Sequence, residues 1–193
     1  MHHIYHTEGI ILGSRNFGEA GKYYYLLTRD LGLVYASAQG VRKMSSKLRF
    51  ILQDFAYIKV DLVQGRDFWR ITSAGKTNKL GQMNKRTDAL KIFANMSHLL
   101  KRLLTGVEPN EALFTDFLRG LLVLEKAETK EALRNIEAVI VLRIINNLGY
   151  IGGDEALKTF IKLPLSEGLA SRAASNRNKI LREINKALKE TQL

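Results

Sequence analysis

IYHTEGIIL (residues 4–12), KYYYLLT (22–28), GLVYASAQG (32–40), FAYIKVDLV (55–63) and FWRITSA (68–74) are the five segments that decide the fold. They are rich in Tyr, Ile, Val and Phe, and Gly-bearing breaks, the first at residues 13–21, separate them in the pattern of β-strands. Five strands with one longer connection after the third predict a Greek-key barrel of the OB type, with a short helix at residues 45–52. An SH3-like barrel is the alternative, because the number of strands does not fix their order.

After residue 80, apolar residues recur at helical spacing. One helix is predicted to end at Gly106 and a second to start at Pro109-Asn110. A third, over residues 130–148, is apolar nearly all round and is expected to form the buried centre of the bundle, with Gly149 as its C-terminal cap. Shorter helices are predicted at residues 154–161 and 175–189. The sequence therefore predicts an α+β protein with two domains, a five-stranded OB-type barrel at residues 1–78 and an α-helical domain at residues 79–193.

The charge of the chain favours a polyanionic partner. Thirty Lys and Arg residues stand against nineteen Asp and Glu residues, which gives a net charge of +11 and a pI near 9.9. A pI above about 9 is typical of nucleic-acid-binding domains, which gain affinity by releasing counterions from phosphates. The alternative is that the basic surface serves solubility alone.

Several function classes lack the residues that they need. The absence of cysteine excludes a disulfide, a Cys-ligated zinc site and a Cys nucleophile. Gly21-Lys22 and Gly75-Lys76 lack the first glycine of a P-loop, which argues against an ATPase. We interpret His2, His3 and His6 as polar positions at the edge of the first strand rather than metal ligands. We therefore expect no enzymatic activity, catalytic residue, metal or cofactor.

The sequence also lacks signals for a membrane or for secretion. No apolar run approaches the roughly 18 residues of a membrane span. The first residues lack the charged and apolar regions of a secretory signal. We expect a soluble protein with a cytoplasmic location and no contact with membranes.

Two acid-free basic stretches are candidates for phosphate contacts. Residues 31–53 contain no acidic residue and carry Arg42, Lys43, Lys47 and Arg49 among Gly and Ser, which let a backbone approach phosphates closely. Residues 70–86 contain Lys76 and Lys79 and likewise have no acid. The last helix is also basic, with its cations on the outer face. A solvated surface is the competing interpretation of each stretch.

Aromatic residues offer surfaces on which single-stranded bases stack. The binding face of an OB barrel runs over its second and third strands and its first and fourth connections. Those elements hold Phe17, Tyr23, Tyr24, Tyr25, Tyr35 and Arg66. Because strand side chains alternate, Tyr23 and Tyr25 share one face and Tyr24 lies on the other. One of these faces is core, and the sequence does not say which.

The order of several fragments resembles the RecO family of bacterial recombination mediators. The fragments are TEGIIL (7–12), RNFGE (15–19), LLTRDLGL (26–33), GVRKMS (40–45), QDF (53–55) and VLRIINNLGY (141–150). The resemblance implies an N-terminal OB fold and a C-terminal helical domain. Two departures stand out. Many members carry a four-Cys zinc site after the Leu-Gly-Tyr helix, where this chain has Gly152-Gly153-Asp154 and no cysteine, and the chain is shorter in that region.

The resemblance further implies a non-catalytic role in recombinational DNA repair. It implies binding of single- and double-stranded DNA, annealing of complementary strands, and loading of a recombinase onto DNA coated by single-strand-binding protein. The implied partners are RecR and the acidic C-terminal tail of single-strand-binding protein, at the nucleoid. The candidate DNA contacts are Arg15, Arg42, Lys43, Lys47, Arg49, Arg66, Lys76 and Lys79. A protein-interaction adaptor and an RNA-binding OB protein remain the alternatives.

Overall fold

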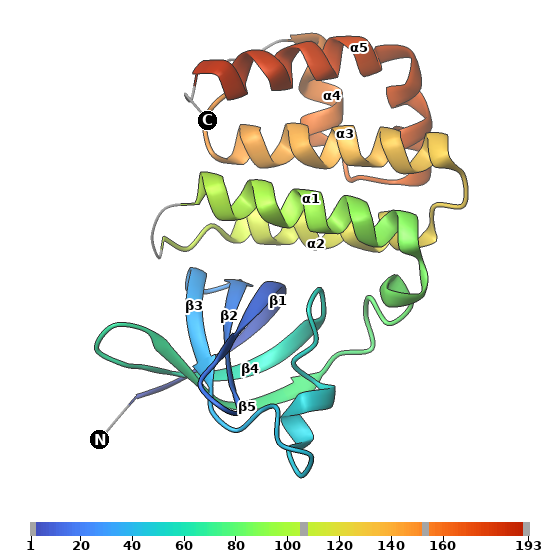
Figure 1. Ribbon diagram of the computed structural model, residues 1–193. Helices are drawn as coiled ribbons and strands as arrows, with labels where there is room; N and C mark the ends of the chain where they lie inside the picture. The colour runs from blue at the N-terminus through green and yellow to red at the C-terminus, as the bar shows by residue number, and fades with distance from the viewer. Residues whose placement is uncertain (1–2, 105–107, 152–154, 191–193) are drawn as a thin grey trace. The chain divides into compact units, whose positions relative to one another are not determined.

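Two structural units make up the chain, described here from a computed structural model (Figure 1). The structure describes residues 3–104, 108–151 and 155–190. One unit comprises Met1–Asn84 with Ser97–Glu111, and the other comprises Lys85–Met96 with Ala112–Leu193. The predicted order of a β-barrel followed by helices is confirmed.

Five strands form a closed barrel in the order β1-β2-β3-β5-β4. Four of the five strand pairs are antiparallel, and a short parallel pairing of β3 with β5 completes the wall. This order is that of an OB-type barrel, which removes the SH3-like alternative. The strands are β1 (Ile4–Phe17), β2 (Gly21–Thr28), β3 (Gly32–Ala38), β4 (Tyr57–Gln64) and β5 (Trp69–Lys76).

The first strand is longer than predicted. The predicted break at residues 13–21 is wrong for its first part, because β1 continues to Phe17. The register shifts between Ile11 and Gly13, where Gly13 has a φ of 146°, so the glycine forms a bulge and not a turn. The bend lets β1 pair with β4 through residues 4–10 and with β2 through residues 9–17, which a closed barrel requires.

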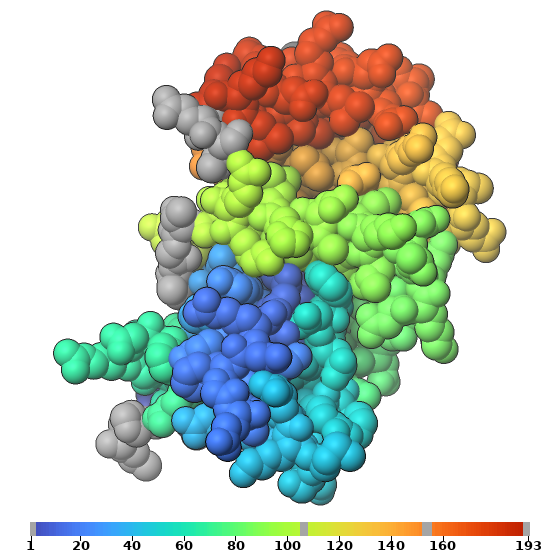
Figure 2. Space-filling model, viewed as in Figure 1, coloured from blue at the N-terminus to red at the C-terminus, as the bar shows by residue number. Residues whose placement is uncertain are grey.

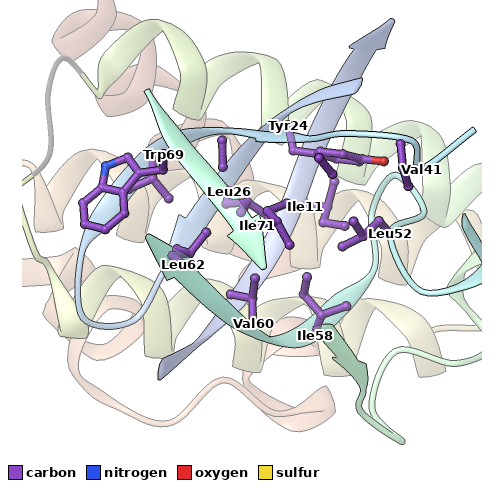
Figure 3. Packing of buried hydrophobic residues seen from close by; sticks show 13 residues of the cluster. Ile11, Tyr24, Leu26, Val41, Leu52, Ile58, Val60, Leu62, Trp69 and Ile71 are labelled. Carbon is purple, nitrogen blue, oxygen red and sulfur yellow. The ribbon is translucent and has the colours of Figure 1, made fainter. Parts of the chain in front are cut away.

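The barrel core is apolar and is closed at one end by the connection after β3. Ile11, Tyr24 and Ile58 are fully buried, and Val41 and Leu52 from that connection lie beside them (Figure 3). The predicted helix at residues 45–52 is a single 3₁₀ turn, Lys47–Phe50. Burying Val41 and Leu52 anchors both ends of the connection, so its polar residues stay at the surface.

The helical elements are close to the prediction except at the last helix. They are α1 (Thr87–Leu103), α2 (Glu111–Lys126), α3 (Lys130–Asn147), α4 (Lys158–Lys162) and α5 (Glu167–Glu190), with 3₁₀ turns at Met83–Lys85 and Glu155–Leu157. The predicted end at Gly106 and the segment Gly152-Gly153-Asp154 lie outside the described residues. The predicted start of the last helix at residue 175 is wrong. Ser166 Oγ accepts a hydrogen bond from Leu169 N–H at 3.2 Å, which caps α5 eight residues earlier.

α3 is buried over most of its circumference, as its all-round apolar pattern predicts. Gly149, two residues after the end of α3, has a φ of 80°, the left-handed conformation of a C-terminal cap. α3 also buries a charge: Arg143 donates to Asp116 of α2 at 3.1 Å and to Phe160 O of α4 at 2.8 Å. No helix in the described part of the chain is long and apolar enough to cross a membrane.

Candidate nucleic-acid interface

The barrel decides which tyrosines of β2 face outward. Tyr24 is fully buried in the core, so Tyr23 and Tyr25 lie on the outer face of the strand. Burial, together with the nearby Asp54 carboxylate, raises the pKa of Tyr24. On β3, Tyr35 pairs directly with Tyr25 and shares its outer face. The question that the sequence leaves open is thereby answered: Tyr24 is core, and its two neighbours belong to the surface layer.

The outward rings form one continuous cluster, which we call the aromatic face. Tyr23 and Tyr35 are stacked, with ring centroids 4.9 Å apart and an interplanar angle of 20°. Phe17 lies 4.6 Å from Tyr23, Tyr25 lies 4.9 Å from Tyr35, and Phe68 meets Tyr23 edge-on at 5.2 Å. Tyr23 is covered by its neighbours, whereas Phe17 is 45% exposed and Tyr25 and Tyr35 are half-buried. The aromatic face therefore offers rings to a ligand along its margin.

Arg15 of β1 lies over this cluster. Its guanidinium carbon is 5.4 Å from the ring centroid of Tyr23 and 5.2 Å from that of Tyr35. A guanidinium above aromatic faces gains a cation–π attraction, which holds the side chain in place while it remains exposed. Burial raises the pKa of Tyr35, and the neighbouring Arg15 opposes part of that rise. The site therefore presents an exposed cation above two aromatic rings.

A groove of about 410 Å³ adjoins the aromatic face. Its walls are Tyr25, Leu33 and Tyr35 on one side and residues 64–69, the turn between β4 and β5, on the other. Arg66 stands exposed in that turn. The volume falls within the range of about 300–1,000 Å³ that is typical of ligand pockets. The groove thus combines stacking surfaces with a cation that can contact phosphate.

The connection after β3, residues 41–53, carries four of the predicted cations and is called the basic loop. The backbone N–H of Arg42 donates to Ala20 O at 2.9 Å, which ties the loop to the turn between β1 and β2. Arg42, Lys43 and Lys47 are exposed and Arg49 is half-buried. Because the β1–β2 turn follows Phe17 in the chain, the tie brings the backbone at Arg42 to the end of the strand pair that carries the aromatic face.

Two exposed apolar side chains share the basic loop. Phe50 is 58% exposed and Met44 is 81% exposed. The Arg49 guanidinium carbon lies 4.6 Å from the Phe50 ring centroid, and its Nη1 donates to Met44 Sδ at 2.8 Å. The loop therefore presents cations next to apolar surface, a combination that suits the faces of bases as well as their phosphates.

Two predicted cations lie on another part of the barrel wall. Lys76 ends β5 and pairs with Ile58 of β4. Lys79 places its Nζ 5.8 Å from the ring centroid of Tyr57, also on β4. β4 pairs with β1 and β5 and not with the strands that carry Tyr23 and Tyr35. The structure thus joins Arg15 and Arg66 to the aromatic face and sets Lys76 and Lys79 apart from it.

The N-terminal histidines show no shared arrangement. His6 Nδ1 lies 2.7 Å from Asp61 Oδ1, an acidic neighbour that is 55 residues away in sequence. His3 packs edge-on against Tyr5, with ring centroids 4.5 Å apart. His2 lies outside the described residues. An exposed His–Asp pair and an aromatic contact account for the two that are described.

Sequence reasoning overlooked Phe68, Met44 and Phe50. Phe68 follows Arg66 in the β4–β5 turn, and its position in the fourth connection of an OB barrel was a usable signal. Met44 and Phe50 gave no such signal, because an apolar residue inside a basic segment is as compatible with burial as with exposure. Only the anchoring of Val41 and Leu52 in the core shows which residues of the loop are left outside.

Residues 1–78 match the family described as "Recombination protein O N terminal". The first 78 residues belong to the RecO family. The similarity extends beyond the RecO barrel: a DNA repair protein RecO of Rubrobacter xylanophilus is 33% identical over 147 residues, which are 76% of this chain and 58% of that protein. The RecO of Desulfitobacterium hafniense is 26% identical over 147 residues, covering 76% of this chain and 52% of its own length.

A third relative, the DNA repair protein RecO of Acetivibrio thermocellus, is 25% identical over 144 residues, or 75% of this chain and 57% of that protein. The chain therefore spans about half the length of the curated RecO relatives that it matches. The aligned region exceeds the 78-residue RecO domain, so the relationship includes part of the helical unit as well as the barrel.

Proposed function

We propose that this protein acts in recombinational DNA repair by binding single-stranded DNA across the aromatic face of its barrel. Bases would stack on the exposed ring of Phe17 and on the accessible parts of the half-buried Tyr25 and Tyr35 rings. Arg15, Arg66 and the basic loop would neutralise the phosphates. The family relationship supports the repair role, and the net charge of +11 supports a polyanionic ligand.

The observation that carries this proposal is the position of Arg15 over the Tyr23–Tyr35 stack. An aromatic cluster that only stabilised the fold would need no exposed cation above it. A bound single strand, by contrast, needs a ring for its base and a cation for its phosphate within the length of one nucleotide. Every base has a π-face, so stacking on such a surface is tolerant of sequence. Binding should therefore be insensitive to base sequence and should weaken steeply with salt.

The finer steps rest on the family relationship. We propose that the protein is non-catalytic, binds double-stranded DNA as well, anneals complementary strands and helps to load a recombinase onto DNA coated by single-strand-binding protein. RecR and the C-terminal tail of single-strand-binding protein are the proposed partners, and the nucleoid is the proposed location. Annealing is compatible with the aromatic face, since stacking on one face of a base leaves its pairing edge accessible.

Fluorescence anisotropy with a labelled oligonucleotide of mixed sequence tests the proposal. The Arg15→Gln variant removes the cation above the rings, and Lys59→Gln is its matched control, an exposed strand cation on β4. We expect Arg15→Gln to weaken binding several-fold and Lys59→Gln to leave it nearly unchanged. Absence of binding by the wild-type protein at low salt would remove the nucleic-acid function. Equal losses of affinity in both variants would move the site away from the aromatic face.

The exposed Met44 and Phe50 favour a second candidate, a protein-interaction adaptor, because exposed apolar groups beside cations also suit an acidic, partly apolar peptide. A partner that stays on the protein after nuclease treatment would support the adaptor if the protein itself showed no affinity for DNA.

An RNA-binding protein is the other alternative, and competition distinguishes it. An RNA oligonucleotide that displaces labelled DNA at a lower concentration than unlabelled DNA does would indicate an RNA-binding protein.

A further inference from the structure

The helical unit has a basic surface of its own on α5. One side of this helix packs along α3, and its residues Ile180, Ile184 and Ala187 are buried (Figure 1). The other side is solvent-exposed, as the uncovered surface of α5 in Figure 2 illustrates. We call it the basic face of α5, and its cations are Arg172, Lys179, Arg182, Lys186 and Lys189.

The cations of this face lie in one row. At 3.6 residues per turn, positions 172, 179, 182, 186 and 189 fall within an arc of about 100° around the helix. The row is about 25 Å long, because 17 residues at 1.5 Å each separate Arg172 from Lys189. Small polar residues fill the exposed positions beside it, namely Ser171, Ser175, Asn178 and Asn185.

Within the described part of the chain, four of the five cations in the row are outside ion pairs. Among the described residues, no salt bridge involves Arg172, Arg182, Lys186 or Lys189. The acidic residues of α5 are Glu167 at its start, the half-buried Glu183 on the margin of the face and Glu190 at its end. Glu183 lies three residues and Glu190 four residues from Lys186, so acids adjoin the row at its C-terminal half, whereas Arg172 has none within four residues on α5. Arg182 and Lys186 are four residues apart and Lys186 and Lys189 are three apart, so like charges are neighbours, an arrangement that destabilises a helix by itself.

We propose that the basic face of α5 binds the phosphate backbone of double-stranded DNA. A row of about 25 Å spans roughly seven base pairs at 3.4 Å each, and a duplex presents its phosphates at fixed intervals over that length. α5 itself carries no aromatic residue, and the exposed Tyr150 lies beside the row only at Lys186, so most of the row offers no ring on which an unpaired base could stack. A membrane surface is the wrong partner, because the apolar side of α5 is already buried against α3.

This second site extends the proposed function and does not depend on the aromatic face. The barrel would hold a single strand by stacking and by phosphate contacts, and α5 would hold a duplex by phosphate contacts alone. A protein with both sites could engage a DNA end or gap, where single-stranded and double-stranded DNA meet. The two sites lie on different units of the chain, so variants can separate them.

The test measures the salt dependence of binding to a labelled blunt duplex of about 20 base pairs and to one of its single strands. The α5 variant is Arg172→Gln, Arg182→Gln, Lys186→Gln and Lys189→Gln, since glutamine keeps helix propensity. Its matched control removes the same charge from exposed lysines of the helical unit outside α5: Lys91→Gln, Lys126→Gln, Lys130→Gln and Lys162→Gln. Circular dichroism establishes that both variants are folded.

We expect the α5 variant to reduce the log–log salt slope for the duplex by about 0.9 for each phosphate that it no longer neutralises, which is about 3 units for three or four phosphates. The control should change the slope by less than about 1 unit, and neither variant should weaken single-strand binding more than about two-fold. Equal reductions of the slope in the two variants would show that only net charge matters and would overturn the proposal, as would an unchanged duplex slope. A protein that binds duplex through α5 and does not bind single strands would instead refute the proposed function of the barrel.

Discussion

The guanidinium carbon of Arg15 lies 5.2 Å from the ring centroid of Tyr35, although the two residues come from different strands, β1 and β3. β2 separates these strands, and its Tyr23 ring stacks on Tyr35 at 4.9 Å. The Arg15 side chain of β1 therefore reaches across β2 as far as Tyr35 of β3. The guanidinium lies near both rings and the side chain is exposed, so a nucleotide at this position would meet both a charge and aromatic surface.

Arg15→Lys separates the charge from the planar group. Lysine keeps the positive charge but lacks the planar guanidinium that lies over the rings of Tyr23 and Tyr35. We expect single-strand affinity to fall about two- to five-fold, the size of an exposed cation–π contribution, while the log–log salt slope stays the same. Anisotropy titrations at several salt concentrations measure both quantities. A changed slope together with unchanged affinity at low salt would contradict the role given to the planar group.

Phe17→Ala and Tyr24→Ala test the inward and outward assignment of the aromatic residues. Phe17 is 45% exposed, so its removal should weaken single-strand binding at least about five-fold, as expected for one stacked base, with little effect on stability. Tyr24 is fully buried, so its removal should lower the free energy of unfolding by about 3 kcal/mol or more. Urea unfolding and anisotropy on both variants measure the two effects. Full DNA affinity in a folded Phe17→Ala variant would remove this ring from the site.

The sequence was sufficient for the class of fold but not for the orientation of its second strand. The alternation of side chains places Tyr23 and Tyr25 on the opposite face of β2 from Tyr24. Both faces of β2 carry aromatic residues, because one face packs in the barrel core and the other forms part of the aromatic face. Only the pairing of β2 with β1 and β3 shows which face of β2 points into the barrel core. The bulge at Gly13 was hidden for a related reason: a glycine breaks the apolar pattern in the same way whether it bends a strand or ends it.

The candidate site was predictable only where its residues are neighbours in the chain. Arg42, Lys43, Lys47 and Arg49 stay together because one loop carries them. Lys76 and Lys79 looked like part of the same basic surface, but the strand order places them beside β4, next to Tyr57. The start of α5 was missed because its first turns bury the small side chains of Ala170 and Ala173, which give a weak helical signal.

Arg143→Met should destabilise the helical unit. Arg143 is 2% exposed and donates to Asp116, Phe160 O and Leu163 O, so its removal leaves two carbonyls without this donor and leaves the Asp116 carboxylate without its cation, with Asn147 Nδ2 as its remaining donor. We expect the free energy of unfolding to fall by about 3 kcal/mol in urea titrations. The double variant Arg143→Met with Asp116→Leu removes the carboxylate that has lost its cation and should recover part of the stability. A double variant no more stable than the single one would contradict a paired charge as the cause.

Stability should fall at high pH in a way that depends on Tyr57. Burial, with a further contribution from Glu8, raises the pKa of Tyr57 to about 12, above its usual value of 10.0. The unfolded chain then loses this proton before the folded chain does, so the stabilisation is complete below pH 10 and is lost as the pH rises toward 12. The free energy of unfolding should decline there by up to about 1.4 kcal/mol per pH unit. Urea titrations at several pH values measure this slope, and Tyr57→Phe should make it shallower. An equally steep slope in the variant would assign the effect to other tyrosines.

The basic loop provides the sharpest test of phosphate contacts on the barrel. Replacing Arg42, Lys43, Lys47 and Arg49 together with Ala removes four cations from a segment without a compensating acid. If three or four of them contact phosphates, the log–log salt slope for single-stranded DNA should drop by about 0.7 for each phosphate no longer neutralised, or roughly 2 to 3 units. Strand annealing should weaken in parallel, because holding two backbones together requires the same neutralisation. Folding should change little, since Val41 and Leu52 still anchor the loop, the three exposed charges should contribute no more than about 0.5 kcal/mol each, and the half-buried Arg49 contacts Met44 and Phe50 of the same loop through its guanidinium. An unchanged salt slope in the folded variant would place the phosphate contacts elsewhere, at Arg15 and Arg66 or at the stretch near Lys76 and Lys79.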